Sequence, residues 1–445
     1  MLQQKLLEGL TVAPPRLTRR DLRLPAVPNK ALAVIGVRRS GKTTFLWQCL
    51  AALLAEGTPR EALLFLGLED DRLVGLETSD LSWLVEEYFR LQPGLRDARP
   101  ATFFLDEIQL VPGWEAFARR LIDTERVRLF LSGSSARLLS REVASSMRGR
   151  ALEVLVHPFS FRESLRHGGK EPDRPWTRLP KAARSVLDAE LRQYLVRGGF
   201  PEVLGVDDRD RSLLLRSYVD VVVLRDVIER HSVSNPLPLR WLQRHLLANP
   251  ASPFSVQKFY DALRSQGIPV GKDTLHAYLG HLEDAFLIRT VSMRSASERQ
   301  RMVNPRKAYP VDPGLIPLFE RTGRSNLGHA LETVVFLELE RRGYEVDYVR
   351  TREGFEVDFL ATASGRPTLL IQACVEVDEQ PVWEREIRAL EAAALLFPEA
   401  VPLLLTLESQ PPRRPLPNGF DWLAAAGWLL DAEPGAALAP ALTPR

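Results

Sequence analysis

The stretch GVRRSGKTT, at residues 36–44, decides the fold of the first part of this 445-residue chain. The apolar run ALAVI at 31–35 precedes it, and the helical pattern FLWQCLAALLAE follows it. Its glycines and lysine have the spacing of a Walker A loop, in which the backbone turns N–H groups toward phosphates and the next helix adds its positive end. The order of strand, loop and helix therefore predicts an α/β fold with a P-loop and a parallel sheet.

The polar side chains of this loop have separate expected roles. Lys42 would reach the β and γ phosphates, and Thr43 would bring its hydroxyl to Mg²⁺. The implied cofactors are ATP and Mg²⁺, whereas the alternative is a glycine turn that binds nothing. The candidate binding residues are Gly36, Arg38, Arg39, Ser40, Gly41, Lys42, Thr43 and Thr44.

A Walker B pattern follows further along the chain. The apolar run ATFFL at 101–105 ends in Asp106 and Glu107. Asp106 would hold Mg²⁺, directly or through water, and Glu107 would orient and activate the attacking water. An earlier strand at 62–68 leads to the acidic residues 69–71, which either approach the nucleotide or form a solvated turn and helix cap.

Further polar groups follow the strand-like run at 127–131. A serine after this run stands where a γ-phosphate sensor is expected, although a cap for a helix at 136–139 explains the pattern equally well. Two arginines then precede the next strand, where they act either as an arginine finger across a subunit boundary or as ordinary surface residues. The sensor candidates are Ser134 and Ser135, and the finger candidates are Arg148 and Arg150.

These motifs, together with FLSGSSARLL, MRGR, HPFSFRE and YLVRGGFPEVL, resemble those of prokaryotic AAA-type ATPases that carry a DUF4143 carboxyl-terminal region. The resemblance runs from about residue 15 to about residue 430. Its specific part is the order of the Walker motifs, HPFSFRE and the GGFPE segment, because Walker motifs alone are common to many ATPases. It implies an AAA-like ATP site, a winged-helix module and a nuclease-like end.

The middle of the chain is expected to be helical at 161–235, as a lid or linker beside a P-loop domain at 1–160. Short helices and strand-like residues at 236–303 form a winged-helix pattern. Its recognition helix, at 272–285, would contact duplex DNA, or the module would only link domains or make protein contacts. The side chains expected to be partly exposed on it are Lys272, Thr274, His276 and Tyr278. The proline-rich segment 304–325 is expected to be an inter-domain linker.

The last part of the chain, 326–445, has the helix and strand order of a restriction-endonuclease-like core. In that core carboxylates on the first helix and second strand, with a Glu-x-Lys pair on the third strand, form a Mg²⁺ site. Glu332, Glu356 and Asp358 match the carboxylates. Gln372 and Cys374 stand where the acid and the lysine belong. Glutamine can still ligate a cation, but cysteine cannot replace an ammonium, so we expect a catalytically degraded nuclease-like domain.

Composition adds few constraints on function. The 59 basic and 57 acidic residues give a net charge of +2, so any contact with DNA must be local. The two cysteines, Cys49 and Cys374, have no metal-site or disulfide spacing. We find no signal peptide pattern and no uncharged apolar run of membrane-spanning length. These features favour a cytoplasmic protein without a membrane partner.

The leading functional hypothesis is a Mg²⁺-dependent ATPase that couples ATP turnover to DNA binding, translocation or remodelling, possibly on branched DNA, as a homo-oligomer. One alternative is an ATP-switched signalling or defence oligomer whose turnover DNA does not stimulate. The other is an ATP-regulated nuclease.

Overall fold

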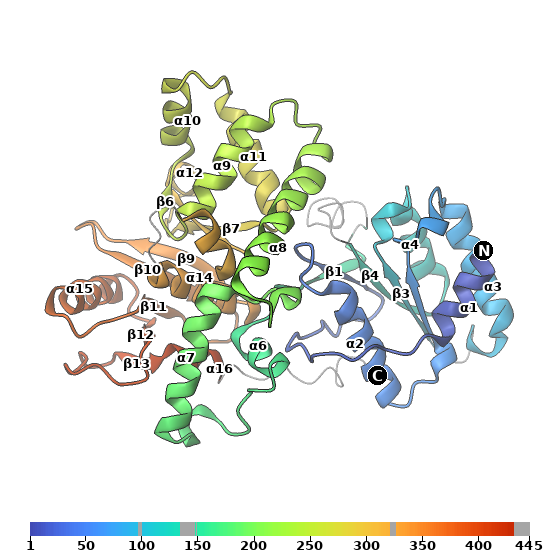
Figure 1. Cartoon of the computed structure of the whole chain (residues 1–445), viewed down its shortest axis with the longest axis horizontal. Coiled ribbons are helices and arrows are strands. Elements are labelled where there is room, and N and C mark those ends of the chain that lie inside the picture. The colour runs from blue at the N-terminus through green and yellow to red at the C-terminus, as the bar shows by residue number, and fades with distance from the viewer. Residues whose placement is uncertain (97–99, 134–146, 148, 321–325, 431–445) are drawn as a thin grey trace. The chain divides into compact units, whose positions relative to one another are not determined.

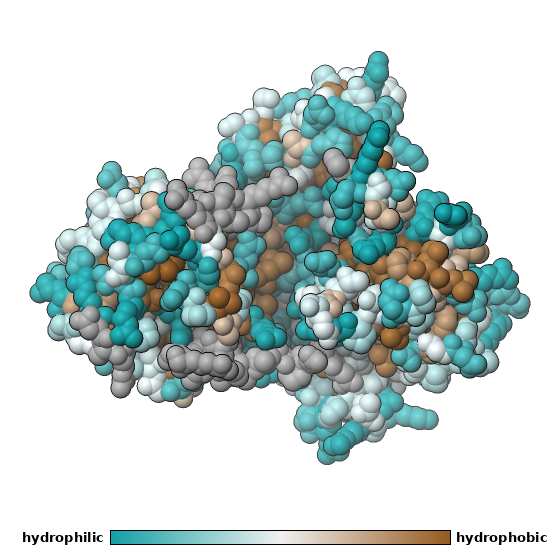
Figure 2. All heavy atoms as spheres, turned by 180° about the vertical axis from the view of Figure 1, so that it is seen from behind, coloured by the Kyte–Doolittle hydropathy of each residue, from teal (hydrophilic) through white to brown (hydrophobic). Residues whose placement is uncertain are grey.

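The structure is a computed structural model that describes residues 1–96, 100–133, 147, 149–320 and 326–430 (Figure 1). The chain forms two compact units, the first of which ends at His157 and the second of which begins at Pro158. None of the described helices combines the length and the apolar composition needed to cross a bilayer. On the face shown in Figure 2, polar side chains predominate and apolar ones lie in separate patches.

The first unit is built on a five-stranded parallel sheet in the order β2-β3-β4-β1-β5. Strand β4 therefore lies between β1, which precedes the GVRRSGKTT loop, and β3, which ends in Asp106. Because all the strands are parallel, their carboxyl ends meet at one edge of the sheet. The strands are β1 Ala31–Ile35, β2 Leu63–Gly67, β3 Ala101–Asp106, β4 Val127–Ser132 and β5 Ala151–Leu155.

Helices pack against this sheet through apolar side chains. Helix α2 begins at Lys42, and its Trp47 ring stacks on Phe65 of β2 with centroids 3.8 Å apart. Cys49, on the same helix, is fully buried, and burial raises the pKa of its thiol. The α-helices are α1 Leu2–Thr11, α2 Lys42–Ala55, α3 Thr78–Leu91 and α4 Trp114–Thr124, and the short 3₁₀ turns are Arg60–Ala62, Asp71–Leu73, Pro93–Leu95 and Ile108–Leu110.

The acidic turn after β2 is a helix cap. The Asp70 carboxylate accepts a hydrogen bond from the backbone N–H of Arg72 at the start of a 3₁₀ turn. It also pairs with the ammonium of Lys5 at 2.8 Å and the guanidinium of Arg72 at 2.7 Å. The cap interpretation of residues 69–71 is thus confirmed.

The second unit combines helices with an eight-stranded mixed sheet in the order β13-β12-β11-β10-β9-β7-β8-β6. Strand β7 pairs in parallel with β9, so one sheet runs from the expected winged-helix region into the expected nuclease-like region. The strands are β6 Pro253–Phe254, β7 Ile288–Met293, β8 Arg306–Pro310, β9 Glu345–Arg350, β10 Glu356–Thr362, β11 Leu369–Cys374, β12 Val401–Thr406 and β13 Asp421–Ala424.

The helices of this unit follow the expected pattern, including the helical block after residue 161. That block ends in a π-helix at Val222–Glu229. The α-helices are α6 Phe161–His167, α7 Lys181–Arg197, α8 Asp208–Val221, α9 Pro236–Ala248, α10 Val256–Ser265, α11 Lys272–Asp284, α12 Glu298–Val303, α13 Ile316–Phe319, α14 Leu327–Arg341, α15 Gln380–Leu396 and α16 Ala425–Leu430, and the 3₁₀ turns are Trp176–Arg178, Pro201–Val203 and Pro313–Leu315.

Two expectations need correction. The expected linker at 304–325 contains strand β8, whose Lys307, Ala308 and Tyr309 are buried, so its prolines bracket a strand instead of marking an open crossing. Tyr278 of α11 is buried, and its hydroxyl donates to the carbonyl of Asn235 at 3.0 Å. The assignments of a winged helix and of a nuclease-like domain stay predictions.

The HPFSFRE and GGFPE segments contact each other in the second unit. The Phe159 N–H donates to the carbonyl of Gly199 at 2.7 Å. The buried Asp312 carboxylate accepts from the N–H groups of Gly199 at 2.7 Å and Gly314 at 2.8 Å. A Cβ added to Gly198, which has φ +80°, would lie 1.8 Å from Oδ1 of Asp312. The double glycine is therefore required by close packing.

We expect Gly198→Ala to lower the free energy of unfolding by about 3 kcal/mol or more. A positive φ with an extended ψ of −171° costs a non-glycine residue about 1–3 kcal/mol, and the clash with Asp312 adds to it. The matched control is Gly205→Ala, which has φ +84° but meets no described atom within 4 Å, and it should lose only the backbone part. Urea unfolding measures both. Equal losses in the two variants would contradict this account of the motif.

Candidate functional site

The GVRRSGKTT loop is shaped by positive backbone angles. Gly36 has φ +144°, Arg39 +66° and Gly41 +97°. A Cβ on Gly36 would lie 2.3 Å from the carbonyl oxygen of Val156, so only glycine fits there. The loop lies between the buried strand β1 and the first residue of α2, as the Walker A pattern requires.

Lys42 is folded onto this loop. Its side chain is 5% exposed, and its ammonium donates to the carbonyls of Gly36 and Val37, both at 3.1 Å. The Ser40 hydroxyl is buried and has no hydrogen-bond partner among the described residues. Buried polar groups normally have partners, so an ammonium, a free hydroxyl and a helix amino terminus in one loop fit a polyphosphate.

Asp106 is held at the centre of the sheet edge. Its carboxylate accepts hydrogen bonds from the hydroxyls of Ser132, at the end of β4, and of Thr43, at the start of α2. Burial raises the pKa of Asp106 above its ordinary range, although these two hydrogen bonds oppose the shift. A carboxylate beside a threonine hydroxyl is the oxygen-rich donor set that Mg²⁺ prefers, so the residues present fit this ion.

Glu107 follows Asp106 in an unusual conformation. Its φ of +56° is in the left-handed region, which a non-glycine residue adopts only where the surroundings hold it. Its N–H donates to the Ser132 hydroxyl at 3.2 Å, and its carboxylate accepts from the Gln109 amide. The turn therefore fixes Glu107 beside Asp106 at the end of β3.

Two residues of this site were not predicted. Ser132 contacts both acidic residues of the Walker B pattern. Arg20 is 5% exposed, and its guanidinium donates to the carbonyls of Ser40, at 3.3 Å, and His157. Its backbone also exchanges two hydrogen bonds with the side chain of Gln48 on α2, at 2.7 and 3.1 Å. A segment before the first strand thus braces the loop.

The expected sensor and finger residues receive little structural description. Ser134, Ser135 and Arg148 lie outside the described residues. Arg150 is described, and its guanidinium pairs with Asp123 at 2.8 Å, both side chains being partly exposed. Its role as an arginine finger stays a prediction.

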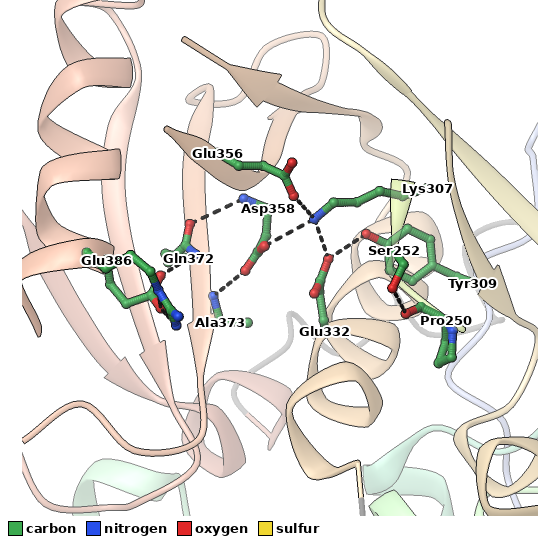
Figure 3. A network of polar contacts seen from close by, with 11 residues as sticks. Pro250, Ser252, Lys307, Tyr309, Glu332, Glu356, Asp358, Gln372, Ala373 and Glu386 are labelled. Atoms are coloured by element: carbon green, nitrogen blue, oxygen red, sulfur yellow. Dashed lines mark hydrogen bonds and ion pairs between the residues drawn. The ribbon is translucent and has the colours of Figure 1, made fainter. Parts of the chain in front are cut away.

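The structure brings together the carboxylates expected at a nuclease-like site (Figure 3). Glu332 of α14 and Glu356 and Asp358 of β10 all contact the ammonium of Lys307, on β8, a residue that the sequence did not single out. Burial and the neighbouring Asp358 raise the pKa of Glu332 to about 8. Burial lowers the pKa of Lys307, but the three carboxylates overcome this and raise it.

Gln372 and Cys374 have other partners. The Gln372 carbonyl accepts from the N–H of Asp358 at 3.3 Å, and its amide nitrogen donates to the carboxylate of Glu386 at 2.6 Å. The Cys374 thiol donates to the carbonyl of Glu376. Gln372 therefore buttresses Asp358, and neither side chain contacts Lys307 directly.

A separate cavity of ≈ 890 Å³ in the second unit is lined by side chains of α8, α9, α10 and α13. Its size suits a ligand site, and the amide nitrogen of Gln243 is buried there without a described hydrogen-bond partner. Arg244 and Lys258 are exposed and form no ion pair within the described part of the chain. The basic and aromatic lining residues are Arg216, Arg240, Arg244, Lys258, His245, Trp241, Phe254, Phe259 and Phe319.

Comparisons with known proteins agree with an ATPase of the AAA type. A family model described as an AAA domain matches residues 28–165, and a domain of unknown function (DUF8612) matches residues 188–325. The second match does not show the DUF4143 region that we expected. The uncharacterized protein MJ1544 of Methanocaldococcus jannaschii is 32% identical over 88% of this chain and 85% of its own length. The chain belongs to the MJ1544 family.

The chain is also similar to a bacterial relative and to one solved structure. An uncharacterized protein of Haemophilus influenzae is 30% identical over 71% of this chain and 75% of its own length. A Walker-type ATPase of Pyrococcus abyssi aligns with 72% of this chain and 94% of its own, at 16% identity and a TM-score of 0.40. The AAA-domain match over residues 28–165 and the parallel sheet of the described first unit together support an AAA-like P-loop fold, with the Walker residues at one sheet edge, in this MJ1544-family protein.

We expect Ser132→Ala to reduce ATP turnover by about tenfold to a hundredfold, because it removes one hydroxyl that holds Asp106 and Glu107 in place. Nucleotide binding should change less, since the loop and Lys42 are untouched. The matched control is Ser185→Ala, because this exposed serine donates to the carbonyl of Lys181 on its own helix α7. Steady-state turnover and nucleotide titration measure the two effects. Full turnover in Ser132→Ala would contradict a positioning role.

Proposed function

We propose that this protein is a Mg²⁺-dependent ATPase that couples ATP turnover to the binding or remodelling of DNA. One observation supports the ATPase part most directly. Three adjacent parallel strands bring together Asp106 at the end of β3, Ser132 at the end of β4 and Lys42 at the start of the helix after β1. The Ser132 hydroxyl donates a hydrogen bond to the Asp106 carboxylate. No sequence pattern alone brings these three segments together.

Each residue has a chemical task in this proposal. The bound Mg²⁺ and ATP supply the reacting phosphoryl group and neutralise its charge. Lys42 exchanges its bonds to loop carbonyls for bonds to phosphate oxygens, and Thr43 and Asp106 hold the cation. Glu107 orients a water and accepts its proton. Ser132 fixes both carboxylates.

Local features of the second unit support contact with DNA. The order is α9, β6, α10, α11, β7, α12, β8, with β8 antiparallel to both β6 and β7. Apart from α12, which stands between the two strands of the wing, this is the element order expected of a winged helix. Helix α11 exposes Lys272 and His276 but also Asp273, so its charge is mixed. The cavity beside α10 adds basic side chains and an exposed Trp241, the combination that attracts phosphates and stacks bases.

Assembly into a homo-oligomer is part of the same proposal. An arginine finger acts on the nucleotide of a neighbouring subunit. Arg150 supports this role because its guanidinium lies on the surface of the first unit, where only the exposed Asp123 pairs with it by a described ion pair. The subunit number stays open to measurement.

We expect Lys42→Ala to abolish nucleotide binding or hydrolysis, because the loop loses its ammonium. Glu107→Gln should keep binding but lower turnover by at least about a hundredfold, because an amide cannot accept the proton. The matched control is Glu69→Gln, an exposed carboxylate after the neighbouring strand β2, which should leave turnover unchanged. Steady-state ATPase assays and nucleotide titration test all three. Retained turnover in both Lys42→Ala and Glu107→Gln would overturn the site assignment.

We expect one form of DNA to stimulate turnover, and Arg244→Ala/Lys258→Ala to weaken that stimulation. Each lost phosphate contact should lower the slope of log K against log salt by about one, so the double variant should lose about two. The control is Arg209→Ala/Lys181→Ala, an equal loss of charge at exposed sites outside the cavity. The assay compares duplex, single-stranded and four-way-junction DNA at several salt concentrations. Turnover indifferent to every form would favour the ATP-switched oligomer.

A further inference from the structure

The carboxylate cluster of the second unit is organised around one buried ammonium. Lys307 is 2% exposed, and its Nζ lies 2.9 Å from Glu332, 2.9 Å from Glu356 and 3.3 Å from Asp358. The three carboxylates come from two elements, α14 and β10, and the lysine comes from a third, β8 (Figure 3). The ammonium thus lies where a cation shared by these oxygens would lie.

The ammonium has no hydrogen-bonding capacity left for a substrate. A lysine ammonium has three N–H donors, and three carboxylates surround it. The Tyr348 ring on β9 also faces the ammonium, with its centre 5.6 Å from Nζ. In a nuclease the corresponding lysine would have to contact the phosphate or the attacking water. All three N–H donors of Lys307 instead face carboxylates of the chain itself.

The carboxylates also have further donors. The Tyr309 hydroxyl donates to Glu332 at 2.7 Å, and the N–H of Ala373 donates to Asp358 at 3.1 Å. The cluster is therefore satisfied by the chain itself, as a buried ionic group must be. A divalent cation has no vacant position among these oxygens.

A metal ion does not fit this arrangement. Mg²⁺ requires oxygens at about 2.0–2.1 Å and Ca²⁺ at about 2.3–2.6 Å, whereas the oxygens here stand 2.9–3.3 Å from Nζ. Within the part of the chain that the structure describes, no three His, Cys, Asp or Glu side chains are arranged to hold a metal ion. The lysine and a metal ion would need the same space.

We propose that the Lys307 ammonium is an internal substitute for the divalent cation of the nuclease-like fold, so that this part of the protein is a metal-free module without phosphodiesterase activity. The glutamine at position 372 agrees with this. Its amide donates to the carboxylate of Glu386, whereas an acid at that position would be repelled by Glu386. The proposal goes beyond the ATPase function and does not depend on it.

The test is a Mn²⁺ titration of nucleotide-free protein by calorimetry and electron paramagnetic resonance. Wild type and Asp358→Asn should bind the same amount of Mn²⁺, because the carboxylate cluster holds none. Lys307→Met keeps the length of the stem but deletes the charge, so it should acquire one Mn²⁺ site with a dissociation constant of about 10⁻⁴–10⁻³ M, the range of weak carboxylate sites. Lys307→Met/Asp358→Asn should lose it again, and Lys181→Met, at an exposed lysine, should bind none.

Three results would overturn the proposal. The first is a Mn²⁺ site in wild type that Asp358→Asn abolishes. The second is DNA cleavage by wild type with Mg²⁺ or Mn²⁺ that Asp358→Asn abolishes. The third is a folded Lys307→Met that binds no cation. If Lys307→Met folds only when Mn²⁺ is added, the cation has replaced the ammonium and the proposal is supported; if it does not fold at all, the two wild-type measurements decide.

Discussion

The position of β4 between β1 and β3 is the constraint on which the nucleotide site depends. It separates the Walker A strand from the Walker B strand by one strand width, about 4.8 Å on each side, and this leaves room for a side chain at the end of β4. Ser132 fills that room and bonds to both Asp106 and Glu107. A direct β1–β3 pairing would bring the loop and the carboxylates together without this third group.

Most residues of the nucleotide site could be predicted, because those that act together are neighbours in the sequence. Lys42 and Thr43 lie within one loop, and Asp106 and Glu107 follow one strand. Ser132 was missed because the strand was expected to end at residue 131, one residue early, which moved the sensor candidates to later serines. Arg20 was missed because it belongs to no motif, and its partners lie 20 and 137 residues away.

In the second unit, the residues that meet at the carboxylate cluster are far apart in the sequence. Its helices and strands follow from periodicity, but Lys307 lies in a proline-rich stretch that reads as a linker, and its carboxylate partners at Glu332 and Asp358 are 25 and 51 residues distant. In the eight-stranded sheet, β9 and β7 lie between β10 and β8, so the side chains meet across two intervening strands. Local sequence patterns carry no information on such a meeting, so the identity of the central cation could come only from the structure.

The contact between Lys307 and its carboxylates also bears on how this protein can change in evolution. The DUF8612 match ends at residue 325, so it contains the lysine but none of the three acidic residues. A recombination that exchanged either side of that boundary with an unrelated sequence would bury an ammonium without counter-charges, or three carboxylates without a cation. The segments on the two sides must therefore be inherited as one block, although the DUF8612 family model covers only the first of them.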